Sequence, residues 1–238
     1  MLKAFVEKIA AMAAPKTVEY EGKLYSDKDL KFIDQAKNRP RSIDVNGLDS
    51  VCKLVRNEVE HVGLKVFVQV ESYNKVKVFT TLGSDNERHY LYHCNADTPS
   101  VTIGRFLSYE NAVIEIRSLY IPNDDTKYLL SLLSSISNES KVTSSDNGVT
   151  QKVEAKSGIA LSQLVEIKPR VVLKPFRTFI EVEQPESEFL LRIDQNGCIG
   201  LFQADGGVWK LEATRNVAGY FENELKDLIE SGQVVVIR

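Results

Sequence analysis

Residues 65–80 read KVFVQVESYNKVKVFT, with apolar and polar residues alternating on both sides of Tyr73-Asn74. An alternation with a period of two is typical of a strand that has one buried and one exposed face. Tyr73-Asn74 interrupts the pattern where a turn is needed, so the stretch predicts a β-hairpin. Residues 88–94 continue the alternation and predict a third antiparallel strand.

Amphipathic helices are predicted on both sides of these strands. In residues 48–62 apolar side chains recur at helical spacing, and Gly63 supplies the stop signal. The same spacing predicts helices over residues 2–12, 26–38, 123–136 and 216–230. Residues 112–120 fit either a helix or a strand, and their β-branched side chains favour a strand.

The second half of the chain is predicted to consist mainly of strands. Asn147-Gly148 suits a tight turn between strands 141–144 and 149–156. Further strands are predicted at 164–168, 171–173, 178–183, 189–193, 198–203, 208–212 and 234–237. Because residues 234–237 are all apolar, this last strand is expected to be buried on both faces, in a sheet of this chain or of a neighbour.

These elements predict an α+β fold. The second half is expected to be mostly antiparallel β-sheet, with amphipathic helices at the N-terminus, in the middle and at the C-terminus. A single domain over residues 1–238 is predicted, in which a helix-rich part (1–137) packs with a β-rich part (138–238).

Composition narrows the function classes. The 238 residues carry a net charge of -3, so a broad basic field for DNA phosphates is missing, although a local basic groove remains open as an alternative. The three cysteines are far apart and form no CxxC pair, which suggests reduced thiols in a cytosol. No run approaches the roughly 20 apolar residues of a membrane span, so no membrane partner is predicted.

The sequence shows no recognisable catalytic or metal-binding motif. It lacks a GxSxG elbow and a phosphate-binding loop, and Asp205-Gly206-Gly207 predicts a tight turn before the strand at 208–212. His89 and His93 would lie about 13 Å apart on one face of a strand, too far for one metal ion. No catalytic residue, metal or cofactor is therefore predicted; an enzyme with an unfamiliar site would rely on His89, His93 or Asp205.

The most unusual stretch is 168–179, which reads KPRVVLKPFRTF and precedes several glutamates. One interpretation is that these opposite charges pair across strands or across a subunit interface. The other is an anion or nucleotide site, in which Arg170 or Arg177 grips phosphate and Phe176 or Trp209 stacks on a base. The candidate binding residues are Arg170, Lys174, Phe176, Arg177, Arg192, Trp209 and Lys210.

Four motifs in the second half resemble a known family. They are DNGVTQ at 146–151, PFRTF at 175–179, EVEQPES at 181–187 (followed by Phe189 and Arg192) and ADGGVWKL at 204–211. Together, over about residues 140–215, they resemble the YfdQ-like group of phage and prophage proteins of unknown function. This resemblance implies expression in a bacterial cytoplasm, and it implies no activity, cofactor or catalytic residue.

The function expected from these observations is that of a phage-encoded, non-catalytic binding or assembly protein, self-associating as a homo-oligomer in the bacterial cytoplasm. Its partner would be a host protein or a nucleotide signal, and counter-defence is one specific form of this role. One alternative is an accessory protein of phage recombination or replication that binds single-stranded DNA, which the net charge disfavours. Another is a structural protein that assembles into a shell or ring.

Overall fold

The computed structural model describes residues 2–14, 16–20, 23–27, 41–83, 86–137, 142–146, 151–155 and 163–238. The chain divides into two compact units, Met1–Arg39 and Pro40–Arg238, and each is described by itself. The expected single domain over the whole chain stays a prediction.

The N-terminal unit contains one helix and one hairpin. Helix α1 (Leu2–Ala13) confirms the predicted amphipathic helix. Strands β1 (Thr17–Tyr20) and β2 (Lys23–Ser26) pair antiparallel and were not predicted. Ser26 therefore ends a strand and does not begin a helix, and the remainder of the predicted helix, from residue 28 on, lies outside the described residues.

The first large sheet of the second unit, here called the β4 sheet, has the strand order β15-β4-β5-β6-β3. The hairpin and third strand predicted from the alternation are confirmed as β4, β5 and β6, which pair antiparallel. The short strand β3 and the terminal strand β15 add parallel edges to them. The elements of this sheet and its helices are β3 (Ile43–Val45), α2 (Leu48–Val62), β4 (Val66–Ser72), β5 (Lys75–Thr80), β6 (Tyr90–Asn95), α5 (Trp209–Glu224), α6 (Lys226–Glu230) and β15 (Val234–Ile237).

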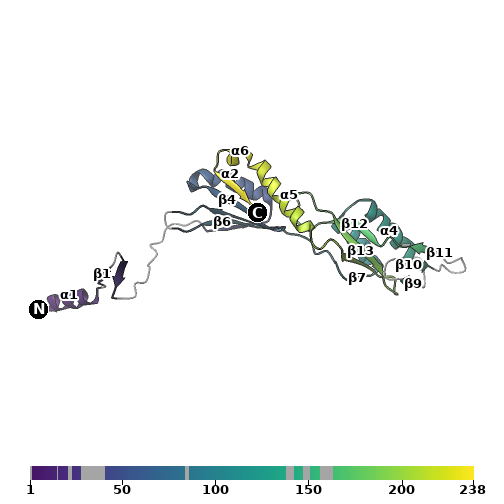
Figure 1. Ribbon diagram of the computed structural model, residues 1–238, viewed down its shortest axis with the longest axis horizontal. Helices are drawn as coiled ribbons and strands as arrows, with labels where there is room; N and C mark the ends of the chain where they lie inside the picture. Colours follow the sequence, from purple (N-terminus) through teal and green to yellow (C-terminus); the bar gives the residue numbers. More distant parts are fainter. Residues whose placement is uncertain are drawn as a thin grey trace. The chain divides into compact units, whose positions relative to one another are not determined.

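Helices α2, α5 and α6 lie on one side of the β4 sheet (Figure 1). Helix α2 has the predicted bounds and ends at Gly63, whose φ of 63° is the left-handed geometry that glycine favours. The core between helices and sheet is made of apolar side chains, among them Leu48, Val55, Val68, Val78, Tyr92, Val217 and Phe221. The inward residues of the strands are thus the valines of the alternating pattern.

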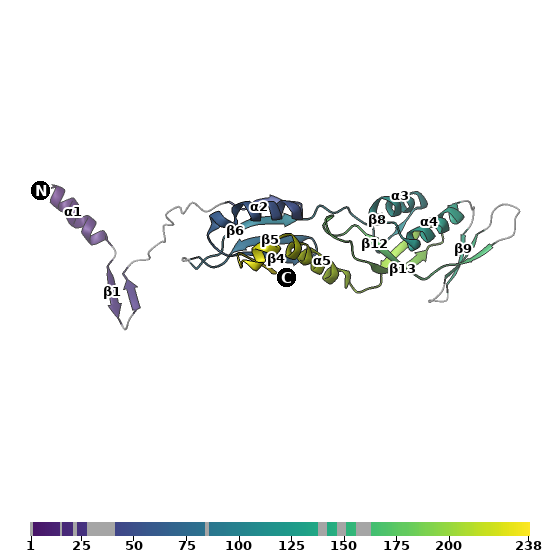
Figure 2. The same ribbon diagram turned by 90° about the horizontal axis from the view of Figure 1, so that it is seen from above.

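The second large sheet, here called the β13 sheet, has the order β7-β14-β13-β12-β8 and is antiparallel throughout. Helix α3 lies beside β8, and α4 lies across β12 and β13 (Figure 2). A further antiparallel sheet, β11-β10-β9, contains the predicted hairpin of 141–156, whose turn lies outside the described residues. The bounds are β7 (Phe106–Leu107), α3 (Tyr109–Leu119), β8 (Tyr120–Ile121), α4 (Asp124–Ser137), β9 (Val142–Asp146), β10 (Gln151–Ala155), β11 (Gln163–Glu166), β12 (Arg170–Pro175), β13 (Ser187–Ile193) and β14 (Ile199–Gln203).

The α+β fold class is confirmed, but residues 112–120 are a correction, because they form most of helix α3 instead of a strand. Ala112 and Ile116, four residues apart, are buried in the core, whereas the β-branched Ile114 is 58% exposed. Of the side chains that favoured a strand, Ile116 makes its buried contacts from a helix and Ile114 makes none. The helical spacing of Ala112 and Ile116 prevails over intrinsic strand preference.

The strand predicted at 208–212 is also wrong, because these residues begin helix α5. Gly206 and Gly207 have φ of 62° and 86°, and the backbone N–H of Gly207 donates to Asp205 Oδ1 at 3.0 Å. The predicted turn at Asp205-Gly206-Gly207 is therefore present, but it leads into a helix. Trp209, Ala213 and Val217 recur every four residues on the buried side of that helix.

Residues 178–183 form a loop, not the predicted strand. The Gln184 side-chain oxygen accepts the backbone N–H groups of Arg177 at 2.9 Å and Thr178 at 3.2 Å. Because these amides are satisfied by a side chain, they need no neighbouring strand. The loop instead places Phe179 in the core between α2 and the β4 sheet.

The terminal strand β15 joins the edge of the β4 sheet and pairs parallel with β4. Only Val234 is buried; Val235, Val236 and Ile237 are half-buried. The prediction that an all-apolar strand would be buried on both faces is therefore wrong. One face packs on α5 and α6, and the other belongs to the outer face of the sheet.

Candidate binding site

The predicted pairing of opposite charges around residues 168–188 is present within this chain. Arg170 Nη1, on β12, donates to Glu188 Oε2, on the neighbouring strand β13, at 2.8 Å. Lys174 Nζ lies 3.0 Å from Glu183 Oε1 and 3.5 Å from Glu186 Oε1. These cations are therefore engaged by carboxylates on the surface of the β13 sheet.

Arg192 lies on the same outer face of the β13 sheet, directly across from Gly200 on β14. Its Nη1 donates to the carbonyl oxygen of Leu191 at 3.1 Å. Beside it, the rings of Phe106 and Phe202 meet edge to face over Gly200, with centroids 5.6 Å apart. Of the predicted set, the outer face of the β13 sheet therefore carries the cations Arg170, Lys174 and Arg192, beside two phenylalanines that were not predicted.

Arg177 lies inside the protein, only 7% exposed. Its Nη2 donates to Ser187 Oγ, and Ser187 Oγ donates to Asp205 Oδ2 at 2.7 Å. Burial lowers the pKa of Arg177 to about 10, against the opposing effect of the Asp205 carboxylate, so the guanidinium is charged at neutral pH. An anion could reach it only if the structure opened locally.

Trp209 and Lys210 complete this cluster at the start of α5. The Arg177 guanidinium lies 3.8 Å from the Trp209 ring centroid, and Tyr73 meets Trp209 edge to face at 4.8 Å. Lys210 is exposed, with Nζ 5.6 Å from the Tyr73 ring centroid. Phe176 is half-buried, and its N–H donates to Leu119 O at 3.0 Å. The seven predicted residues therefore fall into two groups: one on the outer face of the β13 sheet and one around Arg177.

A second surface, which the sequence did not reveal, is the outer face of the β4 sheet. Strand register places Val235, Phe67, Phe79 and Tyr90 side by side in one row across four strands. The next row is polar except for Ile237. It contains one residue from each of the five strands: Ile237, Gln69, Lys77, His93 and Asp44. Within residues 41–83, 86–137 and 163–238, no helix covers this face (Figure 1).

The aromatic row is closely packed. The ring centroids of Phe67 and Phe79 are 5.6 Å apart, and those of Phe79 and Tyr90 are 5.5 Å apart. The Arg88 guanidinium lies 5.5 Å and 5.6 Å from the Phe67 and Phe79 centroids. Tyr90 also stacks on His93 at 5.7 Å with an interplanar angle of 18°, and it is 48% exposed. The row thus ends in a flat, accessible ring.

A polar hollow of about 330 Å³ adjoins this row. It is lined by Asp44, Glu71, Lys75, Val76, Lys77, His93 and Asn95. Lys77 and Glu71 form an ion pair across it. His93 belongs to both the hollow and the ring stack, so the two features form one continuous surface.

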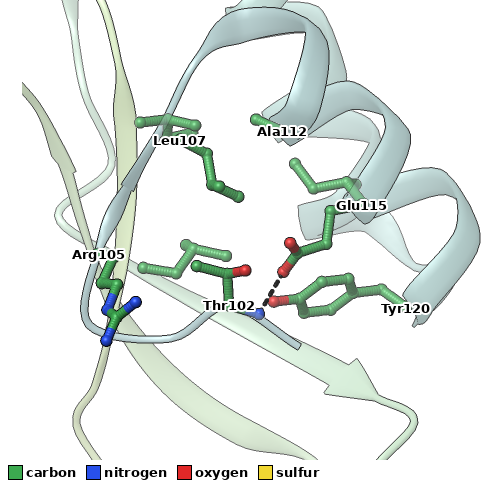
Figure 3. A pocket seen from close by; sticks show the side chains of 9 residues that line it. Thr102, Arg105, Leu107, Ala112, Glu115 and Tyr120 are labelled. Atoms are coloured by element: carbon green, nitrogen blue, oxygen red, sulfur yellow. Dashed lines mark hydrogen bonds between the residues drawn. The ribbon is translucent and has the colours of Figure 1, made fainter. Parts of the chain in front are cut away.

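A smaller hollow lies between α3 and the β13 sheet (Figure 3). The carboxylate of Glu115 and the ring of Tyr120 point into it, and Glu115 Oε1 accepts the backbone N–H of Thr102 at 2.7 Å. Its volume is about 10 Å³, which is room for about one water molecule. Burial raises the pKa of Tyr120, so its hydroxyl remains protonated. This space is too small for a substrate.

The described residues show neither a metal-binding cluster nor an activated buried cysteine. Among the described residues, no three His, Cys, Asp or Glu side chains are placed to hold a metal ion. Burial, together with nearby carboxylates, raises the pKa of Cys52 and of Cys94 to about 12, so neither thiol is a nucleophile at neutral pH. None of the helices in the described residues has the length and apolar character needed to span a lipid bilayer.

Comparison with protein-family models, with curated proteins and with solved structures gave no match. The described residues define an α+β protein with two five-stranded sheets, an aromatic and cationic sheet face, a buried arginine with its partners, and a helix whose apolar side is uncovered within the described part of the N-terminal unit.

Proposed function

We propose that this chain is a non-catalytic binding and assembly protein that works as a homo-oligomer. The observation that carries the proposal is the apolar side of helix α1, which is left uncovered by the described residues of the N-terminal unit. Leu2 is 79% exposed and Met12 75%, and Phe5, Val6 and Ile9 are each more than half exposed. A helix of 12 residues is marginal in water unless an apolar face packs against something.

The spacing of these side chains favours another copy of α1 as the partner. Leu2, Phe5, Ile9 and Met12 are separated by three, four and three residues, the spacing of the contact positions in a coiled coil. Lys3, Glu7 and Lys8 interrupt the rest of the helix and keep its other side polar. One and a half heptads bind weakly alone, so the rest of the chain would contribute to the assembly.

The resemblance to the phage proteins supplies the setting for this proposal. In a bacterial cytoplasm, an oligomer would present several copies of each sheet face to a host protein or nucleotide signal, which increases avidity without new contacts. Counter-defence by sequestering such a partner is the specific form that we propose.

Sedimentation of the full chain tests the assembly. We expect the wild-type chain to sediment as a defined multimer, and the triple variant Leu2→Ser, Phe5→Ser, Ile9→Ser to sediment with fewer subunits. The matched control is Lys3→Ser, Glu7→Ser, Lys8→Ser, which introduces the same number of serines on the polar side and should keep the multimer. A wild-type chain that is monomeric at micromolar concentration would exclude the proposal, and a closed assembly of many subunits would favour a shell or ring.

A second candidate function, the binding of single-stranded nucleic acid, is favoured by the outer face of the β4 sheet. The row of Phe67, Phe79 and Tyr90, with Arg88 stacked on it, combines rings with a cation. Such combinations bind bases by stacking and phosphates by charge. A fluorescence anisotropy titration with labelled oligonucleotides tests this candidate, and binding should weaken steeply with added salt.

A further inference from the structure

We infer that the outer face of the β4 sheet is a stacking platform for the bases of single-stranded nucleic acid, with Tyr90 as the accessible ring and Arg88 as the contact to phosphate. This inference rests on the second candidate function and names its site. The face is defined by two rows of side chains: Val235, Phe67, Phe79 and Tyr90, and then Ile237, Gln69, Lys77, His93 and Asp44.

The rings are arranged to receive a base. Tyr90 contacts two neighbouring rings, those of Phe79 and His93, and the His93 ring is nearly parallel to it at 18°, while 48% of Tyr90 remains exposed. A ring fixed by its neighbours loses little freedom when a base stacks on its exposed side. Every base has a flat π-face, so this contact would tolerate any sequence.

Charge on this face favours a polyanion even though the whole chain is acidic. The cations on or beside this face are Arg88, Lys75 and Lys77, and its carboxylates are those of Asp44 and Glu71. Because Glu71 is already engaged by Lys77, the remaining charge on the face is positive. Arg88 lies over two rings and donates from Nη1 to the carbonyl oxygen of Thr80 at 3.5 Å, and its remaining N–H groups can donate to a phosphate.

The polar hollow beside the rings gives the strand a second contact. Its volume of about 330 Å³ is at the lower end of the range for small-molecule sites. Asp44 and Asn95 can pair with base edges, while Lys75 can contact phosphate. His93 both stacks on Tyr90 and lines the hollow. Two successive nucleotides could therefore bind side by side, one stacked on the Tyr90 ring and the next in the hollow.

The same face fits a second copy of the chain less well. An interface between copies would bury the polar row along with the aromatic one, and charged residues are depleted in the core of such interfaces. Lys77 and Asp44 lie in the polar row, beside Glu71 and Lys75 in the hollow. The phosphates of a nucleic acid can contact the lysines and its base edges can donate to Asp44, whereas an apolar partner surface could do neither.

Anisotropy titrations with the full chain test the site, using fluorescein-labelled oligothymidine and oligouridine of about 20 nucleotides at about 50 mM salt. We expect Tyr90→Ala to weaken binding by about tenfold or more and Tyr90→Phe to retain it, because stacking needs the ring and not the hydroxyl. Arg88→Ala should weaken binding and reduce its salt dependence. The matched controls are Tyr25→Ala, another exposed tyrosine, and Arg117→Ala, an exposed arginine on α3; both should bind within about twofold of wild type.

The outcomes separate the site from the function. If the wild-type chain binds either oligonucleotide and the Tyr90 and Arg88 variants bind equally well, the site is wrong while the nucleic-acid function stands. If the wild-type chain binds neither, both are wrong. If Tyr90→Ala changes the sedimentation of the chain and leaves nucleotide binding unchanged, the face is a contact between subunits, which also overturns the inference. If the wild-type chain binds just one of the two oligonucleotides, and the Tyr90→Ala and Arg88→Ala variants bind it more weakly, the site is supported and the ligand is assigned to DNA or to RNA.

Discussion

The guanidinium of Arg177 lies over the ring of Trp209, 3.8 Å from its centroid. Arg177 comes from the loop after β12 in the β13 sheet, whereas Trp209 begins the helix that packs on the β4 sheet. The adjacent Thr178 hydroxyl donates to the carbonyl oxygen of Tyr73, in the turn between β4 and β5. A single buried cation and its neighbours therefore connect the two sheets.

Replacing Trp209 with alanine should destabilise this connection strongly. The side chain is 6% exposed, so its removal leaves a cavity and takes away the surface on which Arg177 stacks. We expect the free energy of unfolding to fall by about 3–5 kcal/mol, measured by urea denaturation. Trp209→Phe is the informative control, because the indole N–H has no hydrogen-bond partner among the described residues, and its loss breaks no hydrogen bond with them. Equal losses for the two variants would show that the ring contact does not stabilise the junction.

Asp205 should make the stability of the protein dependent on pH in the acid range. Partial burial raises the pKa of its carboxyl. Hydrogen bonds from Gln203, Ser187 and the Gly207 amide, together with the charge of Arg177, lower this pKa by more than burial raises it. The pKa of Asp205 is therefore below its ordinary value. A lowered pKa in the folded state contributes stability that is fully present above the unfolded value of about 3.9. That stability is lost as the pH falls through the folded value.

Asp205→Asn removes this titration. The difference in free energy of unfolding between wild type and variant should therefore be largest near neutral pH and should narrow between about pH 5 and pH 2. Urea denaturation at a series of pH values measures it. In a Ser187→Ala background this free-energy difference should change less with pH, because one of the hydrogen bonds that lowers the pKa of Asp205 is gone. A difference that stays constant over this range would argue against the role given to Asp205.

Elements whose signals are local were predicted well from the sequence. Helix α2 has the predicted bounds because its apolar period and its Gly63 stop both lie within the segment. Helix α4 begins as expected, where Asn123 Oδ1 accepts the N–H of Thr126 at 2.8 Å. The errors at 178–183 and 208–212 arose where contacts distant in sequence, those of Phe179 and Trp209, decided the conformation.

The candidate site was harder to predict than the fold. The alternation in β4 and β5 places Phe67 and Phe79 on the face opposite the core valines, and this was the signal from which the aromatic face could have been predicted. It could not show that Tyr90 lies beside Phe79, because the β5–β6 register contains an irregularity at that point. Nor could it show that Arg177 is buried, since charge suggests exposure unless the partners Ser187 and Trp209 are known.

Gly200 offers a test of the packing on the outer face of the β13 sheet. A Cβ atom at this position would lie 2.8 Å from the Phe202 ring and 3.0 Å from the Phe106 ring, closer than carbon atoms normally approach. Gly200→Ala should therefore force the two rings apart and lower the free energy of unfolding by about 1 kcal/mol. In a Phe106→Ala, Phe202→Ala background the same substitution should instead stabilise the protein by about 0.5–1 kcal/mol, because alanine loses less conformational entropy than glycine in a strand. Urea denaturation of the four proteins completes the cycle, and an effect of the same sign in both backgrounds would mean that the rings are not what requires glycine there.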